Sequence, residues 1–141
     1  VTTRGAGTNL SGGSVPINGG LVLCLTQMNR ILKIVPKDRY AVAQPGVVNE
    51  DLQIALGKDG FFFPPDPSSY TVSTIGGNIA ENAGGPRCLK YGVTSDYVLG
   101  LEAVLASGKI VRLGSANVKD VTGYRAAGIF CGSEGTLGII T

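Results

Sequence analysis

Glycine is the residue that most constrains what this chain can fold into. It occurs 22 times among 141 residues, which is roughly twice its average share. The glycines gather in unevenly spaced clusters and form no repeat of fixed period. Because glycine has no Cβ, its backbone adopts positive φ and approaches a neighbour or a ligand closely. The clusters therefore predict backbone packed tightly against something, in a chain the size of one domain.

The composition excludes several classes of function. Hydrophobic residues make up 43% of the chain and charged residues 16%, which supplies a core and argues against disorder. The formal net charge of +2 creates no strong field for a polyanion, so we expect no nucleic-acid partner. No apolar run reaches about 18 residues, so we expect no transmembrane segment.

Histidine is absent, and cysteine is scarce. Without histidine the chain lacks the commonest general base and the commonest metal ligand, so we expect neither a catalytic residue nor a metal site within it. Cys24, Cys88 and Cys131 are odd in number and widely spaced. That pattern argues against a disulfide framework or a zinc cluster and favours reduced thiols in the cytoplasm. We expect a chain that binds more than it catalyses.

Strand-like runs are spread along the whole chain. The runs expected to form strands are Val1–Thr3, Gly20–Leu25, Ile31–Val35, Tyr40–Gln44, Leu101–Leu105 and Lys109–Leu113. The last two flank Ser107-Gly108, a turn dipeptide, and predict a hairpin. The proline-rich stretch 61–69 is expected to be extended or turning.

Short helices are expected between these strands. Asn49 is placed to cap the first helix. Thr74 is placed to cap the second, which is expected to continue to Asn82 and to carry Asn78 and Asn82 on one face. A third helix is expected within 124–130. Because the strands and helices do not alternate regularly and a hairpin is present, the pattern indicates an α+β fold.

The segment RGAGTNLSGG, residues 4–13, has the composition of an anion-binding loop. Closely set glycines let several N–H groups point into one concavity, and Thr8, Asn9 and Ser11 add polar side chains. A tight strand connection rich in turn-forming residues is the alternative. The next element reads as a strand and no Gly-Lys-Ser/Thr run occurs, which excludes the Rossmann fingerprint and the Walker loop.

Two further regions favour a flat ligand packed on bare backbone. The prolines of PPDPSS, residues 64–69, lower the entropy cost of ordering that loop around a ligand. In TIGGNIAENAGG, residues 74–85, the Gly76-Gly77 pair is expected to offer open N–H groups near a helix start. The strand entered through GSEGTLG, residues 132–138, can present backbone edges to an aromatic ring. Capping turns and a bulged core strand are the plain structural alternatives.

Taken together and in this order, these segments resemble one family. They are RGAGTNLSGG, PPDPSS, TIGGNIAENAGGPRCLKYG and GSEGTLGIIT. The family is that of FAD-linked oxidases of the vanillyl-alcohol oxidase and p-cresol methylhydroxylase type, nearest to the glycolate oxidase flavoprotein subunit and the D-lactate dehydrogenases. The resemblance implies a two-subdomain α+β FAD-binding fold with mixed and antiparallel sheets and short flanking helices. It also implies that residues 1–141 are part of an FAD-binding domain, without the start of its N-terminal lobe or the substrate domain that follows.

The resemblance implies a set of residues around FAD. Some relatives carry a flavin-linked histidine where this chain has Thr8 and Asn9, so the FAD is expected to be non-covalent. The residues implied for the pyrophosphate are Gly5, Ala6, Gly7, Thr8, Asn9, Gly13 and Ser14. Those implied for the flavin and ribityl chain are Pro67, Ser68, Thr74, Gly76, Gly77, Asn82 and Gly84, with Ile139 and Ile140 at the other side of the cofactor.

The function that the resemblance implies for the whole enzyme is oxidation of a 2-hydroxy acid of the glycolate or D-lactate type, with a hydride passing from substrate C2 to flavin N5. The implied partners are that small acid and an iron–sulfur or other electron-acceptor subunit, in the cytoplasm or at the inner face of a membrane. Another oxidoreductase of the same fold, such as an alditol oxidase or a sugar-nucleotide reductase, and a non-catalytic nucleotide-binding module are the alternatives. Arg87 and Lys90 are either guides for the anionic acid or solvated surface charges.

Overall fold

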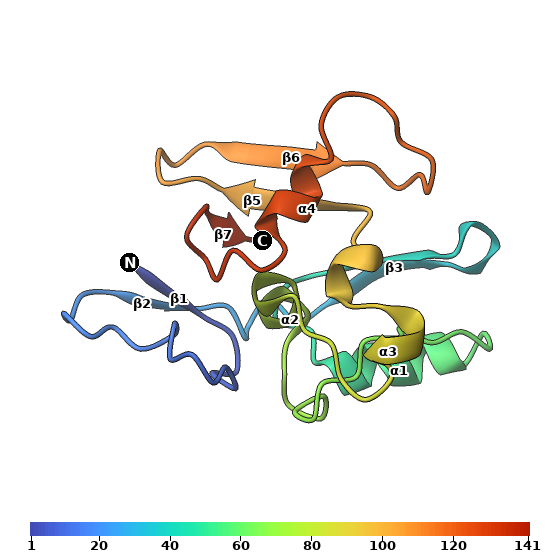
Figure 1. Cartoon of the computed structure of the whole chain (residues 1–141), viewed down its shortest axis with the longest axis horizontal. Helices are drawn as coiled ribbons and strands as arrows, with labels where there is room; N and C mark the ends of the chain where they lie inside the picture. Colours follow the sequence, from blue (N-terminus) through green and yellow to red (C-terminus); the bar gives the residue numbers. More distant parts are fainter.

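The structure is a computed structural model that describes every residue from 1 to 141. Its strands are β1 (Thr2–Arg4), β2 (Val22–Cys24), β3 (Ile31–Val35), β4 (Tyr40–Ala43), β5 (Gly100–Val104), β6 (Ile110–Gly114) and β7 (Ile139–Ile140). Its helices are α1 (Asn49–Gly57), α2 (Ile75–Glu81), α3 (Cys88–Tyr91) and α4 (Ala126–Phe130), with single 3-10 turns at Pro36–Asp38 and Thr94–Asp96. Short helices among small sheets confirm the α+β class (Figure 1).

The strands form three small sheets. β1 and β2 pair in parallel, whereas β3 pairs antiparallel with β4. β5 lies between β6 and β7 and is antiparallel to both. The hairpin of β5 and β6 closes through Ser107-Gly108, with Gly108 at φ +78°, as the sequence predicted.

Helix α1 is present, but Asn49 does not cap it. Val48 occupies the N-cap position without a side-chain hydrogen bond, and Asn49 is the first residue of the helix. The Asn49 side chain is fully buried and donates from Nδ2 to the carbonyl oxygen of Pro65 at 3.1 Å. The Asn49 side chain therefore bonds to Pro65, which is distant in sequence, instead of capping the helix as the local pattern predicted.

Helix α2 begins as predicted and ends one residue earlier. The hydroxyl of Thr74 caps it by accepting a hydrogen bond from the Gly77 N–H at 3.3 Å. Asn82 takes the left-handed conformation (φ 50°) and ends the helix, and its side chain accepts a hydrogen bond from the Ser95 N–H at 2.8 Å. The expectation that Asn78 and Asn82 share one helix face is therefore wrong, because a left-handed C-cap turns its side chain away from the helix.

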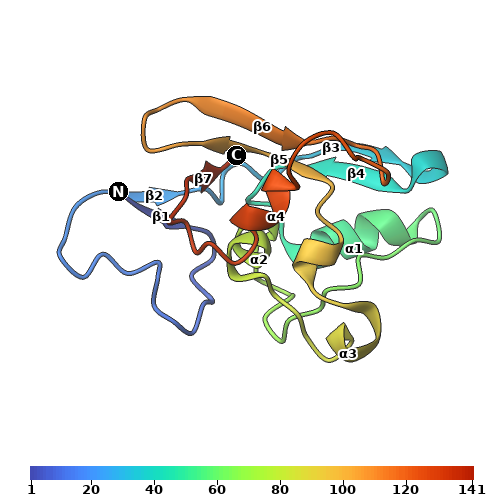
Figure 2. The ribbon, with the colours of Figure 1, turned by 45° about the horizontal axis from the view of Figure 1, so that its top comes forward.

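The core is small and is built on α1 and α2. Val47, Leu52, Ile75 and Ile79 form its buried cluster. Both ribbon views place α2 near the middle of the molecule, among the three sheets (Figures 1 and 2). None of the helices has the length and apolarity needed to cross a bilayer.

Candidate functional site

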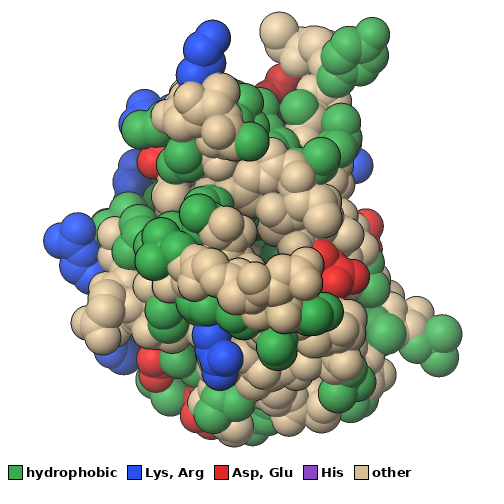
Figure 3. Space-filling view, turned by 90° about the vertical axis from the view of Figure 1, so that its left-hand side faces the viewer, with side chains coloured by type: hydrophobic (Ala, Val, Ile, Leu, Met, Phe, Trp, Pro, Cys, Tyr) green, Lys and Arg blue, Asp and Glu red, His purple; other side chains and the backbone are tan.

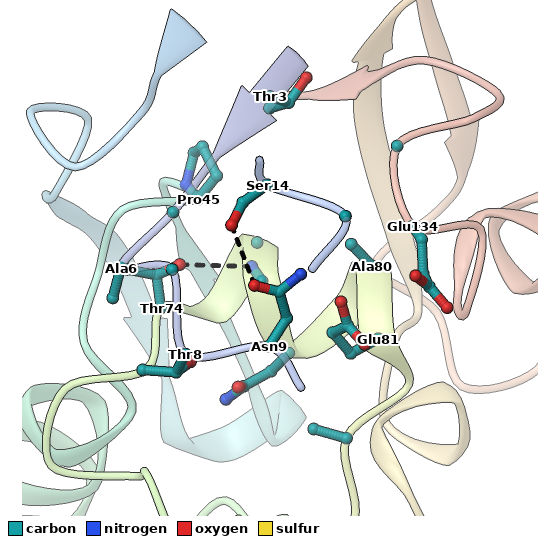
Figure 4. Close-up of a pocket in the computed structure, with 18 of the residues that line it drawn as sticks. Thr3, Ala6, Thr8, Asn9, Ser14, Pro45, Thr74, Ala80, Glu81 and Glu134 are labelled. Atoms are coloured by element: carbon teal, nitrogen blue, oxygen red, sulfur yellow. Dashed lines mark hydrogen bonds between the residues drawn. The ribbon is translucent and has the colours of Figure 1, made fainter. Parts of the chain in front are cut away.

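A cavity of about 500 Å³ opens where the glycine-rich segments meet. It is lined by residues of the first loop, of the turn at 67–69, of α2 and its flanks, and of the segment 134–140 (Figure 4). The space-filling view shows one face hollowed, with the hollow bordered largely by backbone and small polar groups and by acidic side-chain atoms on one side (Figure 3). Segments far apart in sequence thus share one cleft.

Most of the residues that the resemblance implied around FAD line this cavity. They are Gly5, Ala6, Gly7, Thr8, Asn9, Gly13, Ser14, Pro67, Ser68, Thr74, Gly76, Gly77 and Ile140. Asn82, Gly84 and Ile139 do not line it. Asn82 turns toward Ser95, and the Gly84 carbonyl accepts a hydrogen bond from the Asp66 N–H. Ile139 precedes Ile140 on β7, and neighbouring strand residues point to opposite faces.

The first loop leaves a run of backbone donors without partners. None of the N–H groups from Gly5 to Ser11 donates a hydrogen bond within the chain. The loop also sits close against α2, because a Cβ on Gly5 would overlap the Thr74 hydroxyl. Consecutive amides in such a turn form a concavity that binds anions. The loop therefore has the donors that a phosphate group requires.

Asn9 holds the loop in shape. Its amide is best oriented with the oxygen accepting from the N–H groups of Gly13 (2.7 Å) and Ser14 (3.2 Å) and the nitrogen donating to the Ser14 hydroxyl at 2.9 Å. The opposite orientation would set the amide hydrogens against those two N–H groups, although the contact between the two side chains is the same (Figure 4). The amides of Gly13 and Ser14 are thus used within the loop, and those of residues 5–11 are not.

The N-terminus of α2 does not offer the open N–H groups that the sequence predicted. The Gly76 N–H donates to the Pro45 carbonyl at 2.8 Å, and the Gly77 N–H donates to Thr74 Oγ1. The expectation that these two amides are open to an anion is therefore wrong, since neighbouring groups already satisfy them. Instead, α2 packs closely against the segment before α1, since a Cβ on Gly76 would lie 2.6 Å from the Pro45 Cβ.

The residues expected around FAD did not include Asn78, Glu81 or Glu134, all of which line the cavity. Asn78 is 3% exposed and its Nδ2 has no hydrogen-bond partner. Burial raises the pKa of Glu81, and the nearby charge of Glu134 raises it further. Ser11 donates to Glu134 Oε2 at 3.0 Å and so joins the first loop to the last glycine-rich segment. No local pattern marks these contacts, because they exist only once the chain is folded.

Residues 1–114 match a family described as "FAD binding domain". The chain belongs to this FAD-binding family. FAD is therefore its cofactor, and the resemblance read from the glycine-rich segments is confirmed.

Relatives of this FAD-binding domain match it over its full length. It is 57% identical to the glycolate oxidase subunit GlcD of Bacillus subtilis (strain 168) and 47% identical to a D-lactate dehydrogenase of Anaerostipes hadrus. In both cases the match covers 100% of this chain and 30% of the relative. The chain thus spans about a third of the length of these proteins.

A solved structure supports the fold. An alkyldihydroxyacetonephosphate synthase superposes with a TM-score of 0.82 and 31% identity, over 99% of this chain and 27% of that one. The fold is accordingly the α+β fold of p-cresol methylhydroxylase type.

The residues of the cavity suit the cofactor. The diphosphate of FAD requires several donors, which the unpaired amides of 5–11 supply. Gly5 and Gly76 let the segments that form the cavity wall pack closely, because a Cβ at either position would overlap Thr74 or Pro45. The unpartnered amide nitrogen of Asn78 is a buried polar group in the cavity wall, and such groups are rare unless something else satisfies them.

Proposed function

We propose that this chain is the FAD-binding portion of a larger flavin-dependent 2-hydroxy-acid dehydrogenase or oxidase of the glycolate or D-lactate type. The observation that carries the proposal is the full-length identity of 57% and 47% to proteins named for those two acids. The identity to the alkyldihydroxyacetonephosphate synthase is lower, at 31%. The same ranking favours a hydroxy acid over the substrates of other enzymes on this fold.

The cofactor residues follow from the cavity. The amides from Gly5 to Ser11 would hold the pyrophosphate, and Asn9 would keep their loop in shape. The turn at 67–69 and the backbone at 74–77 would line the flavin and ribityl chain. No histidine is present to attach the flavin, so the FAD is proposed to be non-covalent. Acid precipitation of the yellow protein should release the flavin into the supernatant, and flavin that stays in the pellet would contradict this attachment mode.

The substrate-binding groups are proposed to lie outside residues 1–141. A 2-hydroxy acid needs a cation for its carboxylate and a base for its hydroxyl proton, and the cavity is lined by neither lysine, arginine nor histidine. Arg87 pairs with Asp66 at 3.1 Å, and Lys90 lies over the Tyr91 ring at 4.7 Å. These contacts favour surface roles for both cations. The bound flavin would accept the hydride, and this chain would position and shield it.

The test uses the full-length protein. It should purify with FAD and lose its yellow colour on anaerobic addition of glycolate or D-lactate. Reduction by an alditol but by no hydroxy acid would replace the proposal with the alditol oxidase alternative. Because one relative is named as a subunit, we also propose an electron-acceptor subunit, which co-purification under mild conditions would detect.

A further inference from the structure

The wall of the cavity at 67–69 belongs to a stretch with almost no regular structure. No residue from Phe61 to Pro67 belongs to a helix or strand, yet Pro67, Ser68 and Ser69 line the cavity. A stretch without ladder hydrogen bonds must be held in place by other contacts if it is to keep one shape. Two groups of side chains provide such contacts.

The first group comes from α1. Asn49 and Gln53 are four residues apart and so share one helix face. The buried Asn49 amide donates to the Pro65 carbonyl at 3.1 Å. Gln53 accepts from the Phe63 N–H at 3.0 Å and donates to the Phe63 carbonyl. One helix thus fixes three backbone groups just before the cavity wall.

The second group centres on Asp66. Its N–H donates to the Gly84 carbonyl at 3.0 Å, and its Oδ1 accepts from the Arg87 N–H at 3.2 Å. Its Oδ2 pairs with the Arg87 Nε at 3.1 Å. Gly85 has φ +127°, and a Cβ at this position would overlap the Asp66 carbonyl oxygen. Asp66 is thus tied by backbone and side chain to the turn that follows α2.

Pro67 connects Asp66 rigidly to the cavity wall. It is the only residue between Asp66 and Ser68, and its ring fixes φ. The Tyr70 N–H donates to the Pro67 carbonyl at 2.8 Å, and the Ser73 N–H donates to the Ser69 carbonyl at 2.7 Å, so the turn is internally bonded. Such a turn moves as a unit when the residue before it moves.

We propose that Asp66 is a positioning residue, which sets the Pro67–Ser69 wall against the bound cofactor while Asn49 anchors the preceding residue. Asp66 is not among the residues that line the cavity, so it acts through the turn. The proposal rests on the cofactor placement given above.

The test compares variants of the full-length protein. Asp66→Ala removes both side-chain contacts, and we expect it to weaken FAD affinity roughly tenfold, which is the effect of losing one charge-assisted hydrogen bond. Asp66→Asn keeps an acceptor for the Arg87 N–H and should restore most of the affinity. Glu102→Ala is the matched control, since it breaks a 2.8 Å pair with Arg112 on the β5–β6 hairpin and a 3.4 Å contact with the Thr141 hydroxyl, and none of these three residues lines the cavity.

FAD affinity is measured by quenching of flavin fluorescence, at a temperature where circular dichroism shows every variant folded. The visible absorption band of the bound flavin provides a second readout, and it should change in Asp66→Ala and not in Glu102→Ala. If Asp66→Ala does not fold, Arg87→Gln keeps the backbone bond to Oδ1, and a loss of roughly twofold is expected for it.

A lower Tm with unchanged FAD affinity and an unchanged spectrum would show that Asp66 only stabilises the fold, and would overturn the proposal. A wild-type protein that takes up no FAD would overturn the cofactor placement instead. The two failures are therefore distinguishable.

Discussion

Glu81 is an unusual residue in a cavity for an anionic cofactor. It lines the cavity together with Glu134, and no lysine or arginine lines it to compensate for their charge. Burial raises the pKa of Glu81 above its ordinary value of 4.5, and the charge of Glu134 adds to the effect. The ionised form of Glu81 is thus disfavoured in the folded protein relative to the unfolded chain.

The raised pKa of Glu81 predicts how the stability of the protein changes with pH. With a raised folded pKa, the folded state holds the Glu81 proton more strongly than the unfolded state does. The free energy of unfolding should therefore fall as the pH rises from about 4.5 through the raised value. Glu81→Gln should remove this part of the pH dependence in urea unfolding of the FAD-free protein. An unchanged slope in the variant would contradict the assignment.

Asn9 gives a second prediction at the residue scale. In Asn9→Asp a carboxylate can still accept from the Gly13 and Ser14 N–H groups, but it adds a negative charge beside the proposed pyrophosphate site. We expect FAD affinity to fall roughly tenfold or more, because like charges a few ångströms apart repel. Asn117→Asp, in the exposed loop after β6, makes the same chemical change away from the cavity and should leave the affinity unchanged. Equal affinities of the two variants would contradict the prediction.

At the scale of elements, α2 supports the cavity wall by packing closely against a neighbouring segment, and its N-terminal N–H groups are not free to bind a ligand. Its N-terminal N–H groups are bonded to Pro45, Val47 and Thr74. The helix is therefore fixed against the segment before α1, and Gly76 lets that segment come near. Contact between the two segments keeps the wall of the cavity in position.

Gly76→Ala tests this contact. The added Cβ would lie 2.6 Å from the Pro45 Cβ, so we expect a loss of about 1–3 kcal/mol in the free energy of unfolding, as for overpacked cores. Gly128→Ala in α4 is the control, since its Cβ would meet nothing within 4 Å and alanine favours helix. Urea unfolding of both variants measures the difference. Equal stabilities would contradict the packing argument.

The elements that the sequence predicted well are those with local signals. Thr74 caps α2 and Ser107-Gly108 closes the hairpin, because both depend on residues a few positions apart. The role of Asn49 and the bonding of the Gly76 amide depend on Pro65 and Pro45, which only folding brings near. For the site, the glycine-rich segments indicated the cofactor, whereas Glu81 carried no local signal and Asn78 was expected only to share a helix face with Asn82.

At the scale of the whole molecule, large apolar side chains remain exposed. Leu21, which immediately precedes β2, is 64% exposed, and Ile110 on β6 is 67% exposed. Val118, Val121 and Tyr124 are each more than 80% exposed in the loop before α4. Apolar side chains that gather on a surface mark contacts with another protein segment or a partner, and Val118, Val121 and Tyr124 share one loop.

We therefore expect residues 1–141 produced alone to bind a hydrophobic dye such as ANS strongly. The full-length protein at the same concentration should bind much less, because the further domain proposed above would cover these side chains. Fluorescence titration makes the comparison. Equal dye binding by both proteins would show that these surfaces stay exposed in the full-length protein.

The amides from Gly5 to Ser11 are proposed to hold the diphosphate of FAD. The most direct measurement compares the affinities of the full-length FAD-free protein for FAD and for riboflavin, which lacks the diphosphate and the adenosine, and repeats the comparison in a first-loop variant to isolate the diphosphate contacts. Two charge-assisted hydrogen bonds contribute about 3 kcal/mol, so FAD should bind roughly 100-fold more tightly. Gly7→Val, at a position with φ +76°, should remove most of this preference. If the wild-type protein bound both ligands equally, or if Gly7→Val kept the full preference, the first loop would not be the diphosphate site.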